Sequence, residues 1–367
     1  MPQLRVAVLG AGGTIAPAIV HDLAASTAEV AGMLLLDLDG ARAQRVAERH
    51  GGADAVARRV DARATGALAQ QLNEVDVLVN TASYRVNLDA MQACLAAGCH
   101  YLDLGGLYWM TSRQLQLGDE LERAGLLALL GIGSSPGKTN LMALKAVRAL
   151  GDEVEIDTIE VAAAGRDPLA AGDDGRLHPP YALQTLLDEL TLAPVVIERG
   201  EPVEIEPLTD GGELDFGEPV GRAQTIYTLH SELATFPESF GCAAASFRLS
   251  LAPALLAGLE QLTGASAQAV ADAARDAVAP SPETVSVHLV RVTARDGAAV
   301  TVRAVTRPHF GLGGSVVSTA APAAAAVRLL ARGELSATGA RPPERCIDPD
   351  AMFAELEARG CSFTISA

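Results

Sequence analysis

The first 130 residues alternate between short apolar runs and segments with the apolar spacing of a helix. We predict strands near residues 4–9, 33–37, 55–60, 75–80, 100–103 and 126–130, and helices near residues 15–23, 40–50, 64–72, 88–97 and 111–124. Short buried strands that alternate with helices are typical of a parallel sheet with helices on both faces. The pattern therefore predicts an α/β fold that begins with a Rossmann domain, a doubly wound parallel sheet.

The pattern changes at about residue 152, where apolar and polar residues begin to alternate. Two probable hairpins occur, one around Arg199-Gly200 and one around Asp296-Gly297, and helical spacing returns at 181–190, 251–276, 315–331 and 350–359. Alternation with short turns is typical of antiparallel strands. We therefore expect residues 134–314 to form a second, α+β domain for substrate binding and dimerisation. Residues 1–133 plus about 315–367 should form the Rossmann domain.

Composition and charge narrow the class of protein. The 367 residues are 49% hydrophobic and 20% charged, which is ordinary for a globular protein, and no run approaches the ~20 apolar residues of a membrane span. The net charge of -17 argues against binding to nucleic acid or to an anionic membrane. Five scattered cysteines without a CxxC pair, and a start without a signal peptide, favour reduced thiols in the cytoplasm and no metal site.

A glycine-rich turn follows the first strand and is the first candidate binding site. Gly10 and Gly12 match the start of GxGxxG, with Ile15 in the third glycine position; alternatively Gly10, Gly13 and Ala16 match GxxGxxA. Such a turn lets a pyrophosphate approach the backbone, and the following helix directs N–H groups at it. We expect Gly10, Gly12, Gly13, Thr14 and Ile15 to bind the phosphates of a dinucleotide.

Polar residues also follow the second and fourth strands. Asp37 ends the second strand, where a carboxylate accepts hydrogen bonds from the adenosine ribose and repels a 2′-phosphate. We therefore expect NAD rather than NADP; the alternative is that Asp37 only caps the next helix, although Asp39 is better placed for that. Asn80, Thr81 and Ala82 should lie near the nicotinamide ribose.

Five stretches of the chain, in order, carry a family resemblance. They are the glycine turn GAGGTIA, the run from Asp76 that ends in HYLDLGG, the loop GIGSSPGKTN, the pair PVVIERGEPVEIEPL and YTLHSELATFP, and the tail with PPERCIDP and LEARG. The chain resembles the saccharopine dehydrogenase-like family in these stretches, most closely its lysine 6-dehydrogenase branch. It departs from that branch at Ser134-Ser135 and at Lys138, which brings a new cation to the loop.

The resemblance implies an NAD-dependent enzyme that acts on the C–N bond of an amine or amino acid. The leading expectation is oxidative deamination by hydride transfer to NAD, as in lysine 6-dehydrogenase. The alternatives are a reductase of the saccharopine or carboxynorspermidine type, which joins an amine to a carbonyl, and a redox-neutral enzyme that retains NAD, as in homospermidine synthase. A non-catalytic NAD sensor is a fourth hypothesis. Second domains of this kind often pair through a sheet, so we expect a homodimer.

Hydride transfer from an amine needs a group that takes a proton. His230 is the first choice for the general base, because imidazole titrates near neutral pH. Glu232, two residues on, would share a strand face with it and orient it or hold an ammonium group, if the strand persists. Asp103 ends the fifth strand at the cofactor crevice and is the third catalytic candidate. The alternatives are that His230 is a structural histidine, that Glu232 forms a surface ion pair and that Asp103 only forms a turn.

Four residues near the crevice are candidates for substrate binding. Lys138 would hold a substrate carboxylate, beside Asn140 at the start of a helix that Asn140 or Thr139 caps. Tyr84 and Arg85, just past the fourth strand, are within reach of substrate or are solvated edge residues. The remaining histidines are too scattered for a metal site.

Overall fold

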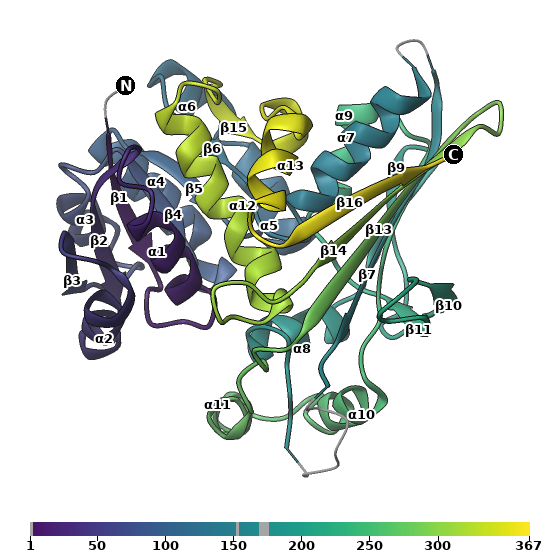
Figure 1. Cartoon of the computed structure of the whole chain (residues 1–367), viewed down its shortest axis with the longest axis horizontal. Coiled ribbons are helices and arrows are strands. Elements are labelled where there is room, and N and C mark those ends of the chain that lie inside the picture. The colour runs from purple at the N-terminus through teal and green to yellow at the C-terminus, as the bar shows by residue number, and fades with distance from the viewer. Residues whose placement is uncertain (1–2, 152–153, 169–175) are drawn as a thin grey trace. The chain divides into compact units, whose positions relative to one another are not determined.

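The structure, a computed structural model, describes residues 3–151, 154–168 and 176–367 (Figure 1). The chain divides into two compact units. The first comprises the chain up to Leu141 together with Thr319–Leu356, and the second comprises Met142–Ser318 together with Glu357–Ala367. The boundaries fall in three helices, α7 (Lys138–Leu150), α12 (Gly314–Ala331) and the last residue of α13 (Pro349–Glu357).

The first unit contains a parallel sheet. Its strands are β1 (Leu4–Leu9), β2 (Val30–Asp37), β3 (Ala55–Arg59), β4 (Val77–Asn80), β5 (His100–Asp103), β6 (Leu127–Leu129) and β15 (Gly339–Arg341), in the order β15-β6-β5-β4-β1-β2-β3. Every neighbouring pair is parallel. The doubly wound sheet is therefore confirmed, and the strand order reverses between β1 and β4, where such sheets bind ligands. The short edge strand β15 was not anticipated.

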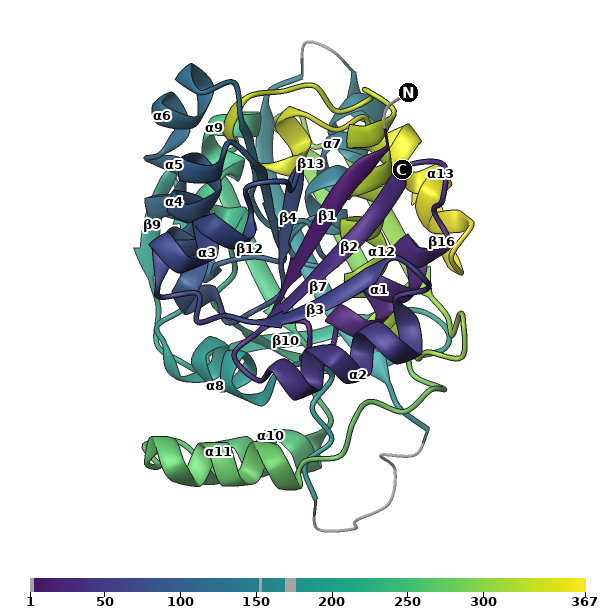
Figure 2. The ribbon, with the colours of Figure 1, turned by 90° about the vertical axis from the view of Figure 1, so that its left-hand side faces the viewer.

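Helices cover both faces of this sheet. They are α1 (Ala16–Ala24), α2 (Gly40–His50), α3 (Thr65–Gln71), α4 (Asn87–Ala97), α5 (Leu107–Leu115), α6 (Gly118–Arg123) and α13 (Pro349–Glu357), with 3₁₀ turns η1 (Tyr84–Val86) and η3 (Pro343–Arg345). Helix α1 packs beside α2 and α3 beside α4, and the two pairs lie on opposite faces (Figure 2). The single helix expected at 111–124 is wrong: α5 starts earlier and ends before α6, because Gln116 and Leu117 turn between them.

The core of the first unit follows from the apolar strands. Val6–Leu9 and all of β4 are buried, because strands in the middle of a parallel sheet are covered on both faces. A continuous apolar run therefore marks the centre of the sheet. Strand β3, at one edge, has two exposed arginines at its end.

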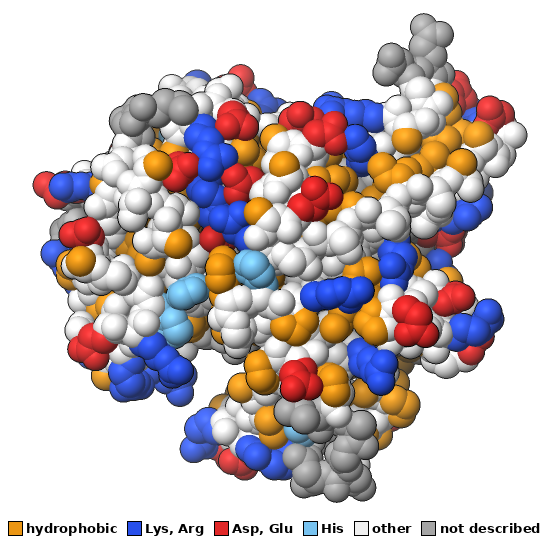
Figure 3. Space-filling model, viewed as in Figure 1, with side chains coloured by type: hydrophobic (Ala, Val, Ile, Leu, Met, Phe, Trp, Pro, Cys, Tyr) orange, Lys and Arg blue, Asp and Glu red, His pale blue; other side chains and the backbone are white. Residues whose placement is uncertain are grey.

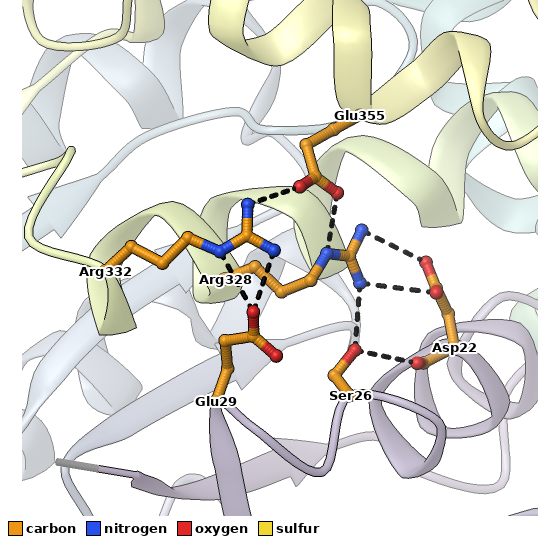
Figure 4. Close-up of polar contacts among 6 residues, drawn as sticks. All are labelled: Asp22, Ser26, Glu29, Arg328, Arg332 and Glu355. Carbon is orange, nitrogen blue, oxygen red and sulfur yellow. Dashed lines mark hydrogen bonds and ion pairs between the residues drawn. The ribbon is translucent and has the colours of Figure 1, made fainter. Parts of the chain in front are cut away.

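An ion-pair network connects the end of α12 with α13, with α1 and with Glu29, which precedes β2 (Figure 4). The Arg328 guanidinium, 2% exposed, contacts Glu355 at 2.7 Å and Asp22 at 3.2 Å and donates to Ser26 Oγ. One turn later, Arg332 contacts the other oxygen of Glu355 and also Glu29, both at 2.7 Å. Arg328 on α12 and Arg332, just past the end of that helix, thus bind residues from three other parts of the unit.

The second unit contains a mixed sheet of nine strands. They are β7 (Ile156–Arg166), β8 (Val195–Glu198), β9 (Glu201–Glu204), β10 (Asp210–Asp215), β11 (Arg222–Tyr227), β12 (Ala244–Leu249), β13 (Val285–Ala294), β14 (Ala299–Thr306) and β16 (Cys361–Ser366). The main order is β10-β11-β12-β7-β13-β14-β16, and β8 and β9 branch from β12. Both expected hairpins, β8–β9 and β13–β14, are confirmed. All pairs are antiparallel except β12 with β7.

Two expectations for this unit are corrected. The helical segment 251–276 is two helices, α10 (Pro253–Gln261) and α11 (Ala267–Asp276), because Ser266 caps α11 by accepting from the Ala269 N–H. The chain after Glu357 does not fold with the Rossmann domain, because β16 pairs with β14. The other helices here are α8 (Leu183–Thr191), α9 (Phe236–Phe240) and the 3₁₀ turn η2 (Glu232–Ala234).

Helix α12 is long and apolar enough, by length and composition, to cross a membrane, and it alone meets that test among the described residues. The sequence pattern had indicated no such stretch. Its apolar window is 83% buried within the molecule. A helix buried in a protein core passes the same test, so the composition of α12 is weak evidence for a membrane span.

Candidate functional site

The glycine turn after β1 is held against the end of β4. Gly10 has φ +77°, and a Cβ on it would lie 2.6 Å from the Ala82 backbone nitrogen. The Thr81 hydroxyl donates to the Leu9 carbonyl at 2.7 Å. A side chain at position 10 would therefore be strained in conformation and would push the two strand ends apart. The structure thus brings Thr81 and Ala82 to the turn.

Asp37 lies at the same edge and ties β2 to the turn. Its Oδ2 accepts from the Gly12 N–H at 2.8 Å, and its Oδ1 accepts from the Asp39 N–H at 2.8 Å. Asp39 caps α2, as expected, so Asp37 is not the cap. A Cβ on Gly12 would lie 2.6 Å from Arg42 Cβ, so this turn also has no room for a side chain.

Helix α1 begins directly after Thr14 and Ile15. Its N-cap residue, Ile15, makes no side-chain capping bond, and a proline occupies the first turn, where a missing N–H costs little. Gly13 donates to the Gly10 carbonyl at 2.9 Å and closes the turn. A tight turn, a helix N-terminus without a side-chain cap and a carboxylate at the end of β2 fit a dinucleotide with its pyrophosphate at α1.

A buried polar network lies behind the end of β4 and β5. The Asn80 amide donates to Asn87 Oδ1 at 2.9 Å and to the Tyr101 hydroxyl at 3.0 Å. Asp103 Oδ2 accepts from Gln114 at 2.6 Å, from Tyr101 at 3.0 Å and from Asn87 at 3.1 Å. Asn80 and Asp103 are thus joined in one network, and each is 1% exposed.

The other oxygen of Asp103 fixes two loops. Its Oδ1 accepts from the Gly131 N–H at 2.7 Å and from the Gly105 N–H at 2.9 Å. Burial raises the pKa of Asp103 above its ordinary value, although the hydrogen bonds oppose that shift. Five donors on one carboxylate describe a residue that positions the loops after β5 and β6, and its catalytic role stays a prediction.

The loop that leads into α7 contains Lys138 and Asn140. Asn140 Oδ1 accepts from the Gly137 N–H at 2.8 Å, and its amide donates to Glu344 at 2.8 Å. Asn140 thus connects this loop to η3. Lys138, the first residue of α7, is 1% exposed. Burial of a lysine requires partners for its ammonium group, and the carboxylate-binding role expected for Lys138 stays a prediction.

Tyr84 and Arg85 lie in η1, just past β4. The Arg85 guanidinium lies 4.8 Å from the centre of the Tyr84 ring, and Ser83 caps the turn by accepting from the Arg85 N–H. Arg85 is exposed and Tyr84 is half-buried. Their expected substrate contacts stay predictions.

His230 and Glu232 meet in the second unit. Strand β11 ends at Tyr227, so the expectation that both lie on one strand face is wrong; His230 is in the loop and Glu232 begins η2. The side chains still converge, with His230 Nδ1 3.4 Å from Glu232 Oε2. The imidazole stacks on the Phe247 ring, with centroids 3.4 Å apart.

A second carboxylate faces the other side of the imidazole. His230 Nε2 lies 3.9 Å from Glu189 Oε2 on α8, and that oxygen accepts a hydrogen bond from the Tyr181 hydroxyl. Within the described residues, neither ring nitrogen of His230 has a hydrogen bond of good geometry, so we describe both contacts as ion-pair contacts. Burial opposes protonation, but Glu232 and then Glu189 outweigh it and raise the pKa of His230. The chemistry available here is proton transfer.

The first unit and the whole fold both resemble known proteins. The family model for the saccharopine dehydrogenase NADP-binding domain matches residues 6–129. The whole fold is similar to saccharopine dehydrogenase (L-Glu forming) from Saccharomyces cerevisiae, with TM-score 0.71 and 15% identity over 99% of this chain and 100% of that one. Residues 6–129 therefore match the NADP-binding domain of saccharopine dehydrogenases, and the chain as a whole has the fold of the yeast enzyme. The family match also supports a nicotinamide cofactor at the glycine turn.

Two curated proteins are similar to this chain in sequence. The chain is 29% identical over 195 residues to carboxynorspermidine synthase from Vibrio cholerae, and 27% identical over 237 residues to carboxyaminopropylagmatine dehydrogenase from Synechocystis. These alignments cover 50% and 62% of this chain. They span 45% and 57% of the relatives' own lengths, so the chain covers about half of each.

Several residues of the site do not follow from the sequence pattern. Asn87, Gln114 and Tyr101 surround Asp103, and Glu189 and Tyr181 complete the His230 cluster. Glu189 sits on a helix whose leucines are buried, so an acid inside that apolar pattern was the available signal. Among the described ranges, no group of three or more His, Cys, Asp or Glu side chains could hold a metal ion.

Proposed function

We propose that the chain is a nicotinamide-dependent oxidoreductase that interconverts an imine, formed from an amine and a carbonyl compound, and the corresponding secondary amine. The observation that carries the proposal is His230 between two buried carboxylates. The relatives named for carboxynorspermidine and carboxyaminopropylagmatine support a substrate that is a carboxylated amine. This reaction is the reductase alternative to oxidation of the lysine 6-dehydrogenase type.

Reduction of an imine adds a hydride to carbon and a proton to nitrogen. The nicotinamide cofactor supplies the hydride when it is bound. His230 supplies the proton, because the two carboxylates favour its imidazolium form. Glu232 fixes the orientation of the imidazole through Nδ1. The imidazolium form can donate a proton to the imine nitrogen, as the reductive direction requires.

In this proposal, the residues of the first unit hold loops and substrate in place and do not exchange protons with the substrate. Asp103 holds the loops after β5 and β6 through five hydrogen bonds. Lys138 and Arg85 are the cations proposed to bind the substrate carboxylate. Asn80 is held by Asn87 and Tyr101, and it accepts from the Ala82 N–H at 3.0 Å, which fixes the loop beside the glycine turn.

We also propose NAD rather than NADP as the cofactor. Asp37 is at the position where a carboxylate binds the ribose hydroxyls, and a 2′-phosphate there would meet its negative charge. Arg42 lies beside Gly12 and is the cation closest to this turn by the contacts described, so it would favour a 2′-phosphate. The carboxylate, which already binds the Gly12 N–H, should dominate.

An enzyme assay tests the reaction. Purified protein is incubated with NADH, a diamine and an aldehyde or 2-oxo acid that carries a carboxylate, and absorbance at the NADH band is followed. We expect NADH to be consumed only when both the amine and the carbonyl compound are present. His230→Gln should abolish turnover while NADH still binds.

The other hypotheses give different outcomes in the same assay. Reduction of NAD with lysine alone would support lysine 6-dehydrogenase-like oxidation. NAD that copurifies, with product formed but no net NADH change, would indicate a redox-neutral enzyme. Absence of any turnover with cofactor still bound would contradict the proposal and favour a sensor. Light scattering on a sizing column checks the proposed homodimer, and cell fractionation checks the proposed cytoplasmic location.

A further inference from the structure

Glu189 is a buried carboxyl group to which the proposed reaction has so far given no step of its own. It lies on α8, and its residue is 4% exposed. Its Oε2 accepts a hydrogen bond from the Tyr181 hydroxyl and is the oxygen that faces His230 Nε2 at 3.9 Å. One carboxylate oxygen therefore connects the half-buried Tyr181 to the deeply buried imidazole.

In the part of the chain that the structure describes, three elements place side chains against His230. Helix α8 presents Glu189, η2 presents Glu232, and β12 presents the Phe247 ring, which has no proton to exchange. Glu232 faces Nδ1, and in the described part of the chain Glu189 is the carboxyl group that contacts Nε2. Asp188 also lies near Glu189, and its negative charge raises the pKa of Glu189.

The electrostatics of the pair agree with this geometry. Burial raises the pKa of Glu189 to about 7, while His230 and the Tyr181 hydrogen bond oppose that rise and Glu232 adds to it. The pKa of His230 is also raised. Two groups that titrate in overlapping ranges and face each other take up and release protons as a pair.

We propose that Glu189 is the proton partner of His230, and that Tyr181 is the positioning residue that holds Glu189 in place. In the proposed reaction, on which this inference rests, His230 gives one proton to the imine nitrogen and becomes neutral. The Glu189 carboxylic acid returns one proton to Nε2 and becomes a carboxylate, which the Tyr181 hydroxyl stabilises. The pair regains that proton from solvent, so one proton is consumed for each imine reduced.

Histidine titration by NMR tests the pair without any substrate. Protein labelled at histidine Cε1 is titrated, and the His230 resonance is assigned by its loss in His230→Asn. Glu189→Gln should lower the measured pKa of His230 by about one unit or more, because it removes one of the two facing charges. Glu198→Gln, at an exposed residue on β8, is the matched control and should leave the titration unchanged. An unchanged His230 pKa in Glu189→Gln would overturn the proposal.

Tyr181→Phe is a second variant that keeps the ring and removes the hydroxyl. Without that hydrogen bond the neutral form of Glu189 is favoured, so the pKa of His230 should fall here too. If Glu189→Gln fails to fold, Tyr181→Phe decides the question. A His230 pKa that stays at its wild-type value in Tyr181→Phe would overturn the positioning role.

Enzyme kinetics then separate this inference from the proposed function. Glu189→Gln should move the pH profile of kcat/KM to lower pH with little change in cofactor affinity. If the NMR shifts occur but no amine and carbonyl pair is turned over, the proton pair stands and the proposed reaction fails. If turnover occurs with an unchanged pH profile and an unchanged NMR titration, the reaction stands and the pair fails.

Discussion

Individual residues at the glycine turn are constrained by distances to their neighbours. Gly10 and Gly12 are in contact with the ends of β4 and α2, so neither position tolerates a side chain. The sequence alone predicted these glycines from spacing, but it did not show which neighbours exclude a Cβ. Those neighbours, Ala82 and Arg42, are 72 and 30 positions further along the chain, where no local pattern reports on them.

Gly12→Ala should weaken cofactor binding. The added Cβ would lie 2.6 Å from Arg42 Cβ and 3.2 Å from Asp37 Oδ2, so the turn must shift at a cost of about 1–3 kcal/mol. The measurement is a fluorescence titration with NADH. Gly66→Ala is the control, because no atom lies within 4 Å of its Cβ in α3 and binding should be unchanged. Equal NADH affinity in the two variants would contradict the prediction.

The His230–Glu189 pair should make stability depend on pH. The pKa of Glu189 rises from 4.5 to about 7 in the folded protein, and that of His230 rises above 6.5. Between the unfolded and folded values, the folded state binds more protons, so the free energy of unfolding falls as the pH rises. The contribution is complete below the unfolded pKa values and is lost as the pH passes the folded ones.

Glu189→Gln removes the carboxyl part of that dependence. From about pH 5 to about pH 8, wild-type protein should lose stability relative to the variant, by about 1–3 kcal/mol. Urea unfolding at a series of pH values measures the difference. A gap between the two proteins that stays constant across this range would show that Glu189 has no raised pKa.

At the scale of elements, charged contacts reinforce the apolar packing of α12. Helix α12 is rich in alanine, which buries little area per residue. Arg328 and, just past the helix, Arg332 add contacts to α1, to Glu29 and to α13. Arg328 is buried and contacts both Asp22 and Glu355, so its removal takes a buried cation away from Asp22 and leaves Glu355 with Arg332. The exposed pair of Arg295 and Glu155 has no such constraint.

Arg328→Ala should therefore destabilise the protein strongly. Breaking a buried ion pair by removal of one partner costs about 3–5 kcal/mol. Arg295→Ala is the matched control, and loss of its solvent-exposed pair should cost about 1 kcal/mol or less. Guanidinium unfolding of both variants against wild type is the measurement. Similar losses in the two variants would mean that the Arg328 network contributes no more than a surface pair.

Elements with a continuous one-dimensional pattern were predictable, and contacts between distant elements were not. The parallel strands, α2 and the two hairpins follow from runs and turns that the sequence contains. The breaks between α5 and α6 and between α10 and α11 were missed, because apolar spacing continues across them. The pairing of β16 with β14 joins residues about 60 positions apart, and Glu189 reaches His230 across 41 positions. Neither follows from local periodicity.

At the scale of the whole molecule, the net negative charge of the protein does not attract an anionic cofactor. The net charge is -17, and basic and acidic side chains are interspersed on the face in Figure 3. Cofactor recognition must therefore come from the local site, where α1 presents its N-terminus and Asp37 and Arg42 have opposite charges. The negative net charge repels the extra phosphate of NADP only weakly at long range, because salt screens it, so the choice between NAD and NADP depends mainly on those two residues.

Thermal unfolding can report that choice without any substrate. A ligand that binds only the folded state stabilises it by RT ln(1 + [L]/Kd), about 2.7 kcal/mol at 100 times Kd. At equal concentrations NADH should raise Tm more than NADPH, because the 2′-phosphate meets the Asp37 carboxylate. Asp37→Ala should reduce the NADH shift and increase the NADPH shift, while Arg42→Ala should reduce only the NADPH shift. A larger shift with NADPH in the wild-type protein would show that Arg42 outweighs Asp37 and that NADP is the cofactor.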